Sequence, residues 1–207
     1  MRDNLTRILL SLHLMAAMPV AALQKSNIEV TPLIGYRFAG EFATSDAKIY
    51  NTLELSEEVS VGLITAWSVD RVRQGELLIS HYKSTFSESA DFSASNTDLN
   101  ITYAHIGGSV PLSNELLPLR VTGGLGLTYL LPNATPLDDE TRFSINIGLA
   151  SVLALSEQIS FRLDSRLYGT FFNSDSSLFC DEKTCAVYIS SDVWVQGEVS
   201  AGISYRF

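Results

Sequence analysis

The chain has 207 residues, of which 46% are hydrophobic and 18% charged, and its formal net charge is −9. Basic residues form no patch, which argues against nucleic acid as a partner. After the N-terminal segment no run approaches the roughly 18 uncharged apolar residues that indicate a membrane-spanning helix, so the apolar residues must be dispersed in a fine alternation.

The N-terminal segment has the organisation of a secretory signal peptide. A positively charged start precedes the apolar stretch Ile8 to Ala17, and small residues at 20–22 come before the expected cleavage site. The alternative is a membrane anchor helix, but that needs about 20 apolar residues and the run breaks at Pro19. We expect a signal peptide over 1–22 and one domain over 23–207.

The rest of the sequence is a series of segments in which apolar and polar residues alternate with period two, the pattern of two-faced β-strands. Eight such segments span, in chain order, 27–38, 53–69, 75–86, 98–110, 119–131, 142–155, 159–171 and 192–207. The fifth is the clearest, with Val121, Leu125, Leu127, Tyr129 and Leu131 alternating against Arg120, Thr122, Gly124, Gly126 and Thr128.

The connections between these segments alternate in length. Those after the second, fourth and sixth segments are short, whereas the other four are longer. An even strand count, short periplasmic turns and longer external loops are typical of bacterial outer-membrane barrels. The sequence therefore predicts an all-β protein, an eight-stranded antiparallel up-and-down transmembrane β-barrel with both termini in the periplasm.

The facing of two segments needs a choice. In the third, Leu77, Leu78 and Ile79 are consecutive apolar residues, so both faces look alike. We expect Leu78, Tyr82 and Phe86 to face outward, because the opposite register would turn His81 and Lys83 towards lipid. In the fourth, Leu99, Ile101 and Tyr103 form the apolar face against Asn100, Thr102 and Ala104.

A soluble β-sandwich would also alternate, so the membrane assignment needs further support. Glycine and serine dominate the polar faces of the fifth, sixth and eighth segments, which suits a crowded barrel interior. Aromatic residues gather near segment ends, as interfacial girdles do. These residues are Tyr36, Phe38, Trp67, Phe86, Tyr129, Phe171, Tyr205 and Phe207.

The second half of the chain carries a resemblance to a known family. Its last strand, Val199 to Phe207, alternates and ends in an aromatic residue. The other matching stretches are Gly107-Gly108, Gly123-Gly124-Leu-Gly126, Arg166-Leu-Tyr-Gly-Thr170, Asn173-Ser-Asp175, Leu178-Phe-Cys180, Cys185 and Trp194-Val-Gln-Gly-Glu198. In these stretches the chain resembles an uncharacterised family of small proteobacterial outer-membrane β-barrel proteins.

The resemblance implies the barrel fold and a place in the cell outer membrane of a Gram-negative bacterium. It also implies that the barrel-assembly machinery recognises the C-terminal strand that ends in Phe207. It implies no activity for any residue. The expected partners are outer-membrane lipid and lipopolysaccharide, and we expect a monomer.

Charged residues on the polar faces are expected inside the barrel. They are Glu29, Arg37, Lys83, Arg120, Arg142, Arg162, Asp164, Arg166, Glu198 and Arg206. Arg162, Asp164 and Arg166 recur at period two, and Glu198 of the last segment is expected beside them, so these four are predicted to form a lumen charge network. An eight-stranded interior is barely wide enough to be filled by side chains, which favours a plug over the alternative of a narrow pore.

Cys180 and Cys185 lie in the last long connection. Because an exported protein meets an oxidising periplasm, a disulfide between them is predicted. Two thiols without a nearby histidine cannot complete a structural zinc site, and we expect neither a metal nor another cofactor. The acidic residues of the long connections, such as Asp138-Asp139-Glu140, leave open the binding of divalent cations.

An enzymatic role is the main alternative, since some eight-stranded barrels modify lipid A. Such chemistry needs a histidine beside a serine and a carboxylate at the outer edge of the membrane. Only His81 and His105 remain after the signal segment, and neither is expected at the outer rim. The sequence therefore favours a non-catalytic structural or surface-interaction protein over a lipid A-modifying enzyme.

Overall fold

The structure is a computed structural model, and it describes ten stretches of the chain. These are residues 28–38, 41–43, 52–54, 56–85, 98–112, 118–133, 138–172, 176–180, 185–189 and 193–207. The expected signal peptide lies outside them. Within these stretches, no helix is long and apolar enough to cross a membrane.

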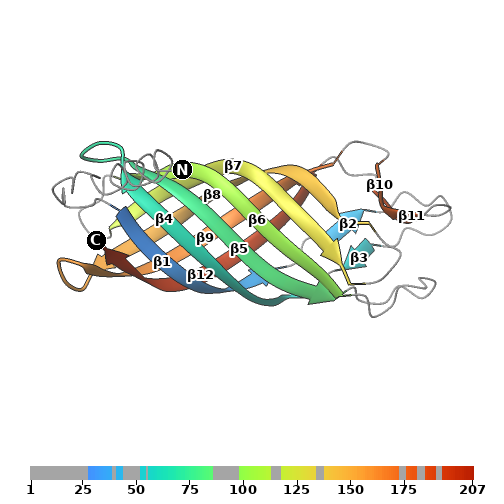
Figure 1. The fold of residues 1–207 in the computed structure, drawn as a ribbon, viewed down its shortest axis with the longest axis horizontal. Helices are drawn as coiled ribbons and strands as arrows, with labels where there is room; N and C mark the ends of the chain where they lie inside the picture. Colours follow the sequence, from blue (N-terminus) through green and yellow to red (C-terminus); the bar gives the residue numbers. More distant parts are fainter. Residues whose placement is uncertain are drawn as a thin grey trace, which may run out of the picture.

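Eight strands form a closed antiparallel barrel (Figure 1). They are β1 (Ile28–Phe38), β4 (Glu58–Ser68), β5 (Gln74–Thr85), β6 (Asp98–Pro111), β7 (Leu119–Pro132), β8 (Glu140–Ala154), β9 (Ile159–Phe171) and β12 (Val193–Arg206). Each pairs with the next of these strands along the chain, and β1 closes the barrel against β12. The predicted fold is confirmed.

Four short strands occupy two of the long connections, which the alternation did not predict. Strands β2 (Glu41–Ala43) and β3 (Thr52–Glu54) pair between β1 and β4. Strands β10 (Ser176–Cys180) and β11 (Cys185–Ile189) pair between β9 and β12. Figure 1 shows all four beyond the barrel end opposite the C-terminus. Following the asymmetry of outer-membrane barrels, we call that end external and the end with the short turns periplasmic.

The outer surface of the barrel is an apolar belt. Alternate side chains of each strand point away from the lumen, and many large apolar ones are more than 40% exposed. In mid-strand they include Ile34, Val61, Ile79, Ile106, Leu125, Ile147, Leu167 and Val199. A closed sheet with such an exterior satisfies its backbone internally and leaves no edge, which is the requirement for crossing a bilayer with strands.

Aromatic side chains border this belt at both ends. Near the external end, Tyr36 packs edge-on against Phe38, and Phe143 lies 5.7 Å from Phe171 between ring centroids. At the periplasmic end, Tyr205 packs edge-on against Phe207. Trp67 lies flat over its cross-strand partner Gly75, where an added Cβ would come within 2.3 Å of the indole ring. The girdles expected from the sequence are therefore present at both ends.

Strands β5 and β6 face the opposite way from the prediction. Leu78 and Tyr82 are buried in the lumen with 2% and 1% exposure, while His81 and Lys83 point outward. On β6, Leu99, Ile101 and Tyr103 are likewise buried inside. The reason is that Leu77, Leu78 and Ile79 are all apolar, so the local alternation does not fix which face of β5 points into the lumen. The ion pairs of Glu76 with Arg162 and Arg166 inside the barrel fix it. Phe86 lies outside the described residues.

Candidate functional site in the barrel lumen

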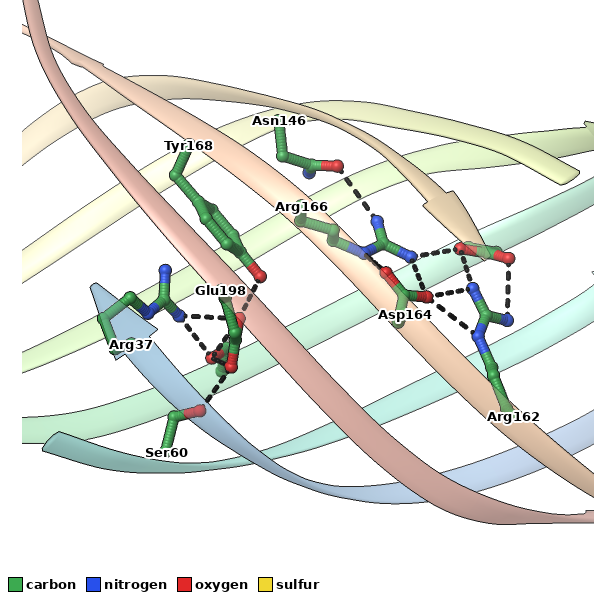
Figure 2. A network of polar contacts seen from close by, with 10 residues as sticks. Arg37, Ser60, Asn146, Arg162, Asp164, Arg166, Tyr168 and Glu198 are labelled. Carbon is green, nitrogen blue, oxygen red and sulfur yellow. Dashed lines mark hydrogen bonds and ion pairs between the residues drawn. The ribbon is translucent and has the colours of Figure 1, made fainter. Parts of the chain in front are cut away.

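Polar side chains of the lumen gather in two clusters (Figure 2). The periplasmic cluster consists of Glu76, Asn146, Arg162, Asp164 and Arg166. The external cluster consists of Arg37, Ser60, Ser80, Tyr168 and Glu198. Every member of both clusters is buried. Because the interior is a low-dielectric space, buried charges at these positions require partners.

The periplasmic cluster is built around two arginines on β9. The period-two spacing of Arg162, Asp164 and Arg166 places all three side chains in the lumen. Asp164 accepts hydrogen bonds from both neighbours, at 2.7 Å from Arg162 Nη2 and 2.7 Å from Arg166 Nε. Since one carboxylate cannot balance two guanidinium groups, the cluster needs a second acid.

Glu76 of β5 supplies that second acid. Arg162 donates to both of its carboxylate oxygens, at 3.0 and 3.3 Å, and Arg166 donates at 3.0 Å. Arg166 also donates to Asn146 Oδ1 at 3.0 Å. Two arginines thus meet two carboxylates, with side-chain exposures of 5% or less, and the formal charges of the cluster cancel.

The external cluster is built around one ion pair between β1 and β12. Arg37 donates to Glu198 Oε2 at 2.9 Å and to Ser80 Oγ at 2.7 Å. Glu198 also accepts hydrogen bonds from the hydroxyl groups of Tyr168, at 2.6 Å, and Ser60. Ser80 donates to the same carboxylate at 3.3 Å, so Glu198 accepts hydrogen bonds from four other strands and is the centre of this cluster.

Three tyrosine rings enclose the Arg37 guanidinium. Its central carbon lies 4.1 Å from the ring centroid of Tyr168, 4.9 Å from that of Tyr103 and 5.0 Å from that of Tyr82. Gln196 accepts a hydrogen bond from the Tyr103 hydroxyl at 2.6 Å and donates one to Tyr82. Cation–π contacts are strongest where water is excluded, as it is here.

His105 lies beside the same rings and contacts Ser144. The His105 Nε2 and Ser144 Oγ atoms are 2.8 Å apart, and His105 stacks on Tyr168 with 5.7 Å between ring centroids. Both residues are buried, His105 at 2% exposure. Among the described residues, His105 Nδ1 has no hydrogen-bond partner. A serine–histidine pair is present, but no carboxylate of the described residues hydrogen-bonds this imidazole, and the pair is buried inside the barrel.

Apolar side chains fill the space left around the two clusters. They form one buried group together with the enclosing tyrosines, and include Leu33, Ile64, Leu78, Leu99, Ile101, Leu130, Phe172 and Trp194. At the periplasmic mouth Arg120 donates to the carbonyl oxygens of Val72 and Ser109, and Arg206 pairs with Glu29 at 3.0 Å. The lumen is therefore packed with side chains along its length.

The predicted lumen network is divided between the two clusters. Arg162, Asp164 and Arg166 meet as expected from their spacing, whereas Glu198 lies in the external cluster with Arg37. Glu76 was missed because the inverted assignment of β5 turned it outward. Charge balance could have found it, since two arginines beside one aspartate require another acid. Lys83, expected inside, points outward and pairs with Asp98 at 2.6 Å.

The backbone register of the β10–β11 hairpin pairs Cys180 with Cys185. Directly opposed residues of an antiparallel pair have Cα atoms about 4.5–5.5 Å apart, which is within the range of disulfides. The disulfide itself remains a prediction.

In the acidic run of the β7–β8 connection, Asp139 accepts a hydrogen bond from Tyr129 and Glu140 pairs with Arg142.

Comparison with known proteins defines the fold. No protein-family model matches the chain, and no curated protein matches it either. Among solved structures, the outer membrane protein AlkL in DMPC bilayers aligns over 88% of this chain and 90% of its own, with TM-score 0.59 and 14% identity. The fold is that of a small outer-membrane β-barrel.

Two further solved structures agree. The outer membrane protein OprG from Pseudomonas aeruginosa aligns over 88% of this chain and 97% of its own, with TM-score 0.56 and 11% identity. Neisserial surface protein A aligns over 88% and 98%, with TM-score 0.54 and 12% identity. At these identities the likeness establishes the architecture, and it is the architecture that the resemblance in the second half of the sequence implied.

Proposed function

We propose that this chain is an integral outer-membrane protein with a sealed barrel and a non-catalytic structural or surface-interaction role. The observation that carries the proposal is the charge-balanced packing of the lumen. Arg162 and Arg166 are matched by Glu76 and Asp164, and Arg37 is matched by Glu198.

A sealed lumen follows from the burial of these groups. Arg37 and Arg162 are 0% and 1% exposed, so water does not reach the guanidinium groups that would line a conducting path. Eight strands leave little interior space, and here large side chains and paired charges occupy it. With the lumen closed, the parts of the protein available to other molecules are the outer belt and the external connections.

Conductance in planar lipid bilayers tests the seal. The wild-type protein is expected to insert without current steps above the bare bilayer. The double variant Arg162→Gly with Asp164→Gly removes one charge of each sign and is expected to produce steps. The matched control, Arg73→Gly with Asp70→Gly, removes the same ion pair from the exposed β4–β5 turn and should stay silent. Steady conduction by the wild type would overturn the sealed barrel.

A lipid A-modifying enzyme is the second candidate, and one observation favours it. The inverted facing of β5 brings His81 to the outside, where its Nδ1 atom lies 2.9 Å from Thr102 Oγ1. However, Asp98, the carboxylate on the same face, pairs with Lys83 rather than with the imidazole. Mass analysis of lipid A from cells with and without the gene discriminates the two, and a mass change that depends on the gene would favour the enzyme.

A further inference from the structure

Strands β5 and β6 are adjacent in the barrel (Figure 1), and a group of outward polar residues interrupts the apolar belt there. Six consecutive outward positions near the external end are polar, and we call them the polar notch. They are His81, Lys83 and Thr85 of β5 with Asp98, Asn100 and Thr102 of β6. The neighbouring strands carry apolar residues at the same height of the barrel. Val61 of β4 is the cross-strand partner of His81, and Leu131 of β7 is the partner of Asn100.

The notch opens at the level of the external girdle. Thr102 pairs with Tyr129, whose hydroxyl group donates to Asp139 in the connection beyond the barrel rim. A lysine on the lipid face costs about 2–4 kcal/mol at the bilayer midplane but only about 0–1 kcal/mol near the interface. The position of Lys83 is therefore compatible with a membrane only at head-group depth, where lipid phosphates lie.

The side chains of the notch keep hydrogen-bonding capacity that faces the lipid. The Lys83 ammonium donates to Asp98 at 2.6 Å, yet an ammonium has three donors and the side chain is 54% exposed. His81 uses Nδ1 for Thr102, so its second ring nitrogen, Nε2, remains for another partner. Asn100 is the direct cross-strand partner of Lys83 in the β5–β6 register, and it lies two residues from Thr102, the partner of His81. The notch therefore holds one cation and one carboxylate in an ion pair, and the two ammonium donors that Lys83 does not use for Asp98, with neutral donors beside them, suit an acceptor-rich anion.

We propose that the polar notch binds a phosphate on the head group of an outer-leaflet glycolipid. Lys83 supplies the charge, His81 and Asn100 supply hydrogen bonds, and Asp98 holds the ammonium in place. The apolar side chains below the notch, Leu77 and Ile79, face the acyl chains of the same lipid. This inference rests on the proposed outer-membrane location and names the lipid chemistry that the barrel exterior recognises.

Lipid retention in nanodiscs tests this site. The full barrel is inserted in phosphatidylcholine discs doped with lipid A or with dephosphorylated lipid A, and the lipid retained after release is measured by native mass spectrometry. The wild type is expected to retain the phosphorylated form. Lys83→Gln and His81→Gln should each lower its retention about tenfold, the loss expected for one hydrogen bond that involves a charged group.

Two variants serve as controls. Lys83→Arg keeps the cation and should retain phosphorylated lipid A, which also covers the case in which Lys83→Gln fails to fold. Arg73→Gln removes a cation from a similar exposed ion pair with Asp70 in the periplasmic turn, and should leave retention unchanged.

Three results would overturn the site. They are equal retention of both lipids by the wild type, unchanged retention in Lys83→Gln and His81→Gln, and a lipid-independent dimer that Lys83→Gln disrupts. The last would mean that a second copy of the chain covers the notch. A protein that fractionates away from outer membranes would instead defeat the proposed location, and the two failures are distinguishable because the nanodisc measurement uses purified barrel.

Discussion

Glu76 of β5 and Arg162 of β9 face each other across the barrel, joined by two hydrogen bonds of 3.0 and 3.3 Å. The two strands are not neighbours in the sheet, since β5 lies between β4 and β6 while β9 lies between β8 and β12. The pair therefore braces the barrel through its lumen, independently of the backbone ladders. Removing either member leaves a charge stranded in a confined interior.

Glu76→Ala should weaken the barrel strongly. The change leaves Arg162 and Arg166 with only Asp164 between them, and breaking a buried ion pair by removing one partner costs about 3–5 kcal/mol. The free energy of unfolding can be measured by urea titration of the protein refolded in lipid vesicles. Glu157→Ala, in the exposed turn between β8 and β9, is the control and should change it by less than about 0.5 kcal/mol. A loss below about 1 kcal/mol for Glu76→Ala would contradict the brace.

Glu198→Leu should also destabilise the barrel by about 3–5 kcal/mol, because Arg37 would keep its charge among three tyrosines without a carboxylate. The double variant Arg37→Met with Glu198→Leu removes both charges and should recover much of the loss, since a buried pair can often be replaced by apolar residues at little cost. The coupling between the two positions follows from a double-mutant cycle in the same urea titration. Additive losses would mean that the two side chains do not interact.

The facing of β5 can be tested with one residue type at two outward positions. Ile79→Arg places a charge in the apolar belt and should oppose membrane insertion by about 2–4 kcal/mol. His81→Arg, two residues along the same face but in the polar notch, should cost less than about 1 kcal/mol. Refolding yield and urea stability in vesicles measure both. If Ile79→Arg left refolding and stability unchanged, Ile79 and His81 would face the lumen, as the sequence predicted, and not the bilayer.

Cys180 and Cys185 should be oxidised to a disulfide in the exported protein. A thiol reagent applied to unreduced, denatured protein should therefore leave both unlabelled, and should label both after reduction. The double serine variant should assemble normally, because the crosslink closes only a small loop in the external hairpin. Ready labelling before reduction would refute the disulfide.

The carboxyl group of Asp70, in the turn between β4 and β5, should titrate at unusually low pH. The backbone N–H groups of Arg73 and Val72 and the Arg73 guanidinium donate to the Asp70 carboxylate and lower its pKa to about 2. A depressed pKa stabilises the turn above the ordinary aspartate range, and this stabilisation is lost as the pH falls through about 2. The carboxyl ¹³C shift of Asp70 against pH measures the midpoint, and a value near 4 would show that these hydrogen bonds do not form.

Much of the architecture could be predicted from the sequence because each strand of a transmembrane barrel alternates apolar residues, which face lipid, with polar residues, which face the lumen. In β7, Val121 to Leu131 alternates so regularly that only one face can meet the bilayer. The lengths of the connections then order the strands and place the termini together. The same alternation brings Arg162, Asp164 and Arg166 to one face of β9, because neighbours two apart on a strand always share a side.

Pairs between distant strands could not be predicted in this way. The alternation along a strand shows which residues share a face with Arg37, Glu76 or Glu198. It does not show at what height along the barrel each of these side chains meets a partner across the lumen. That height depends on the register of every strand between them. Consequently Glu198, expected beside Arg162, pairs with Arg37 instead.

The sequence by itself determined an eight-stranded barrel with an apolar exterior, since alternation, glycine-rich polar faces and the aromatic C-terminal strand together favour it over a soluble β-sandwich. Only the tertiary structure decided which way β5 and β6 face. Leu77, Leu78 and Ile79 are equally apolar on both sides, so the local preference is nearly zero. The charged residues make the choice, because Glu76 pairs with two arginines inside while Lys83 pairs with Asp98 outside.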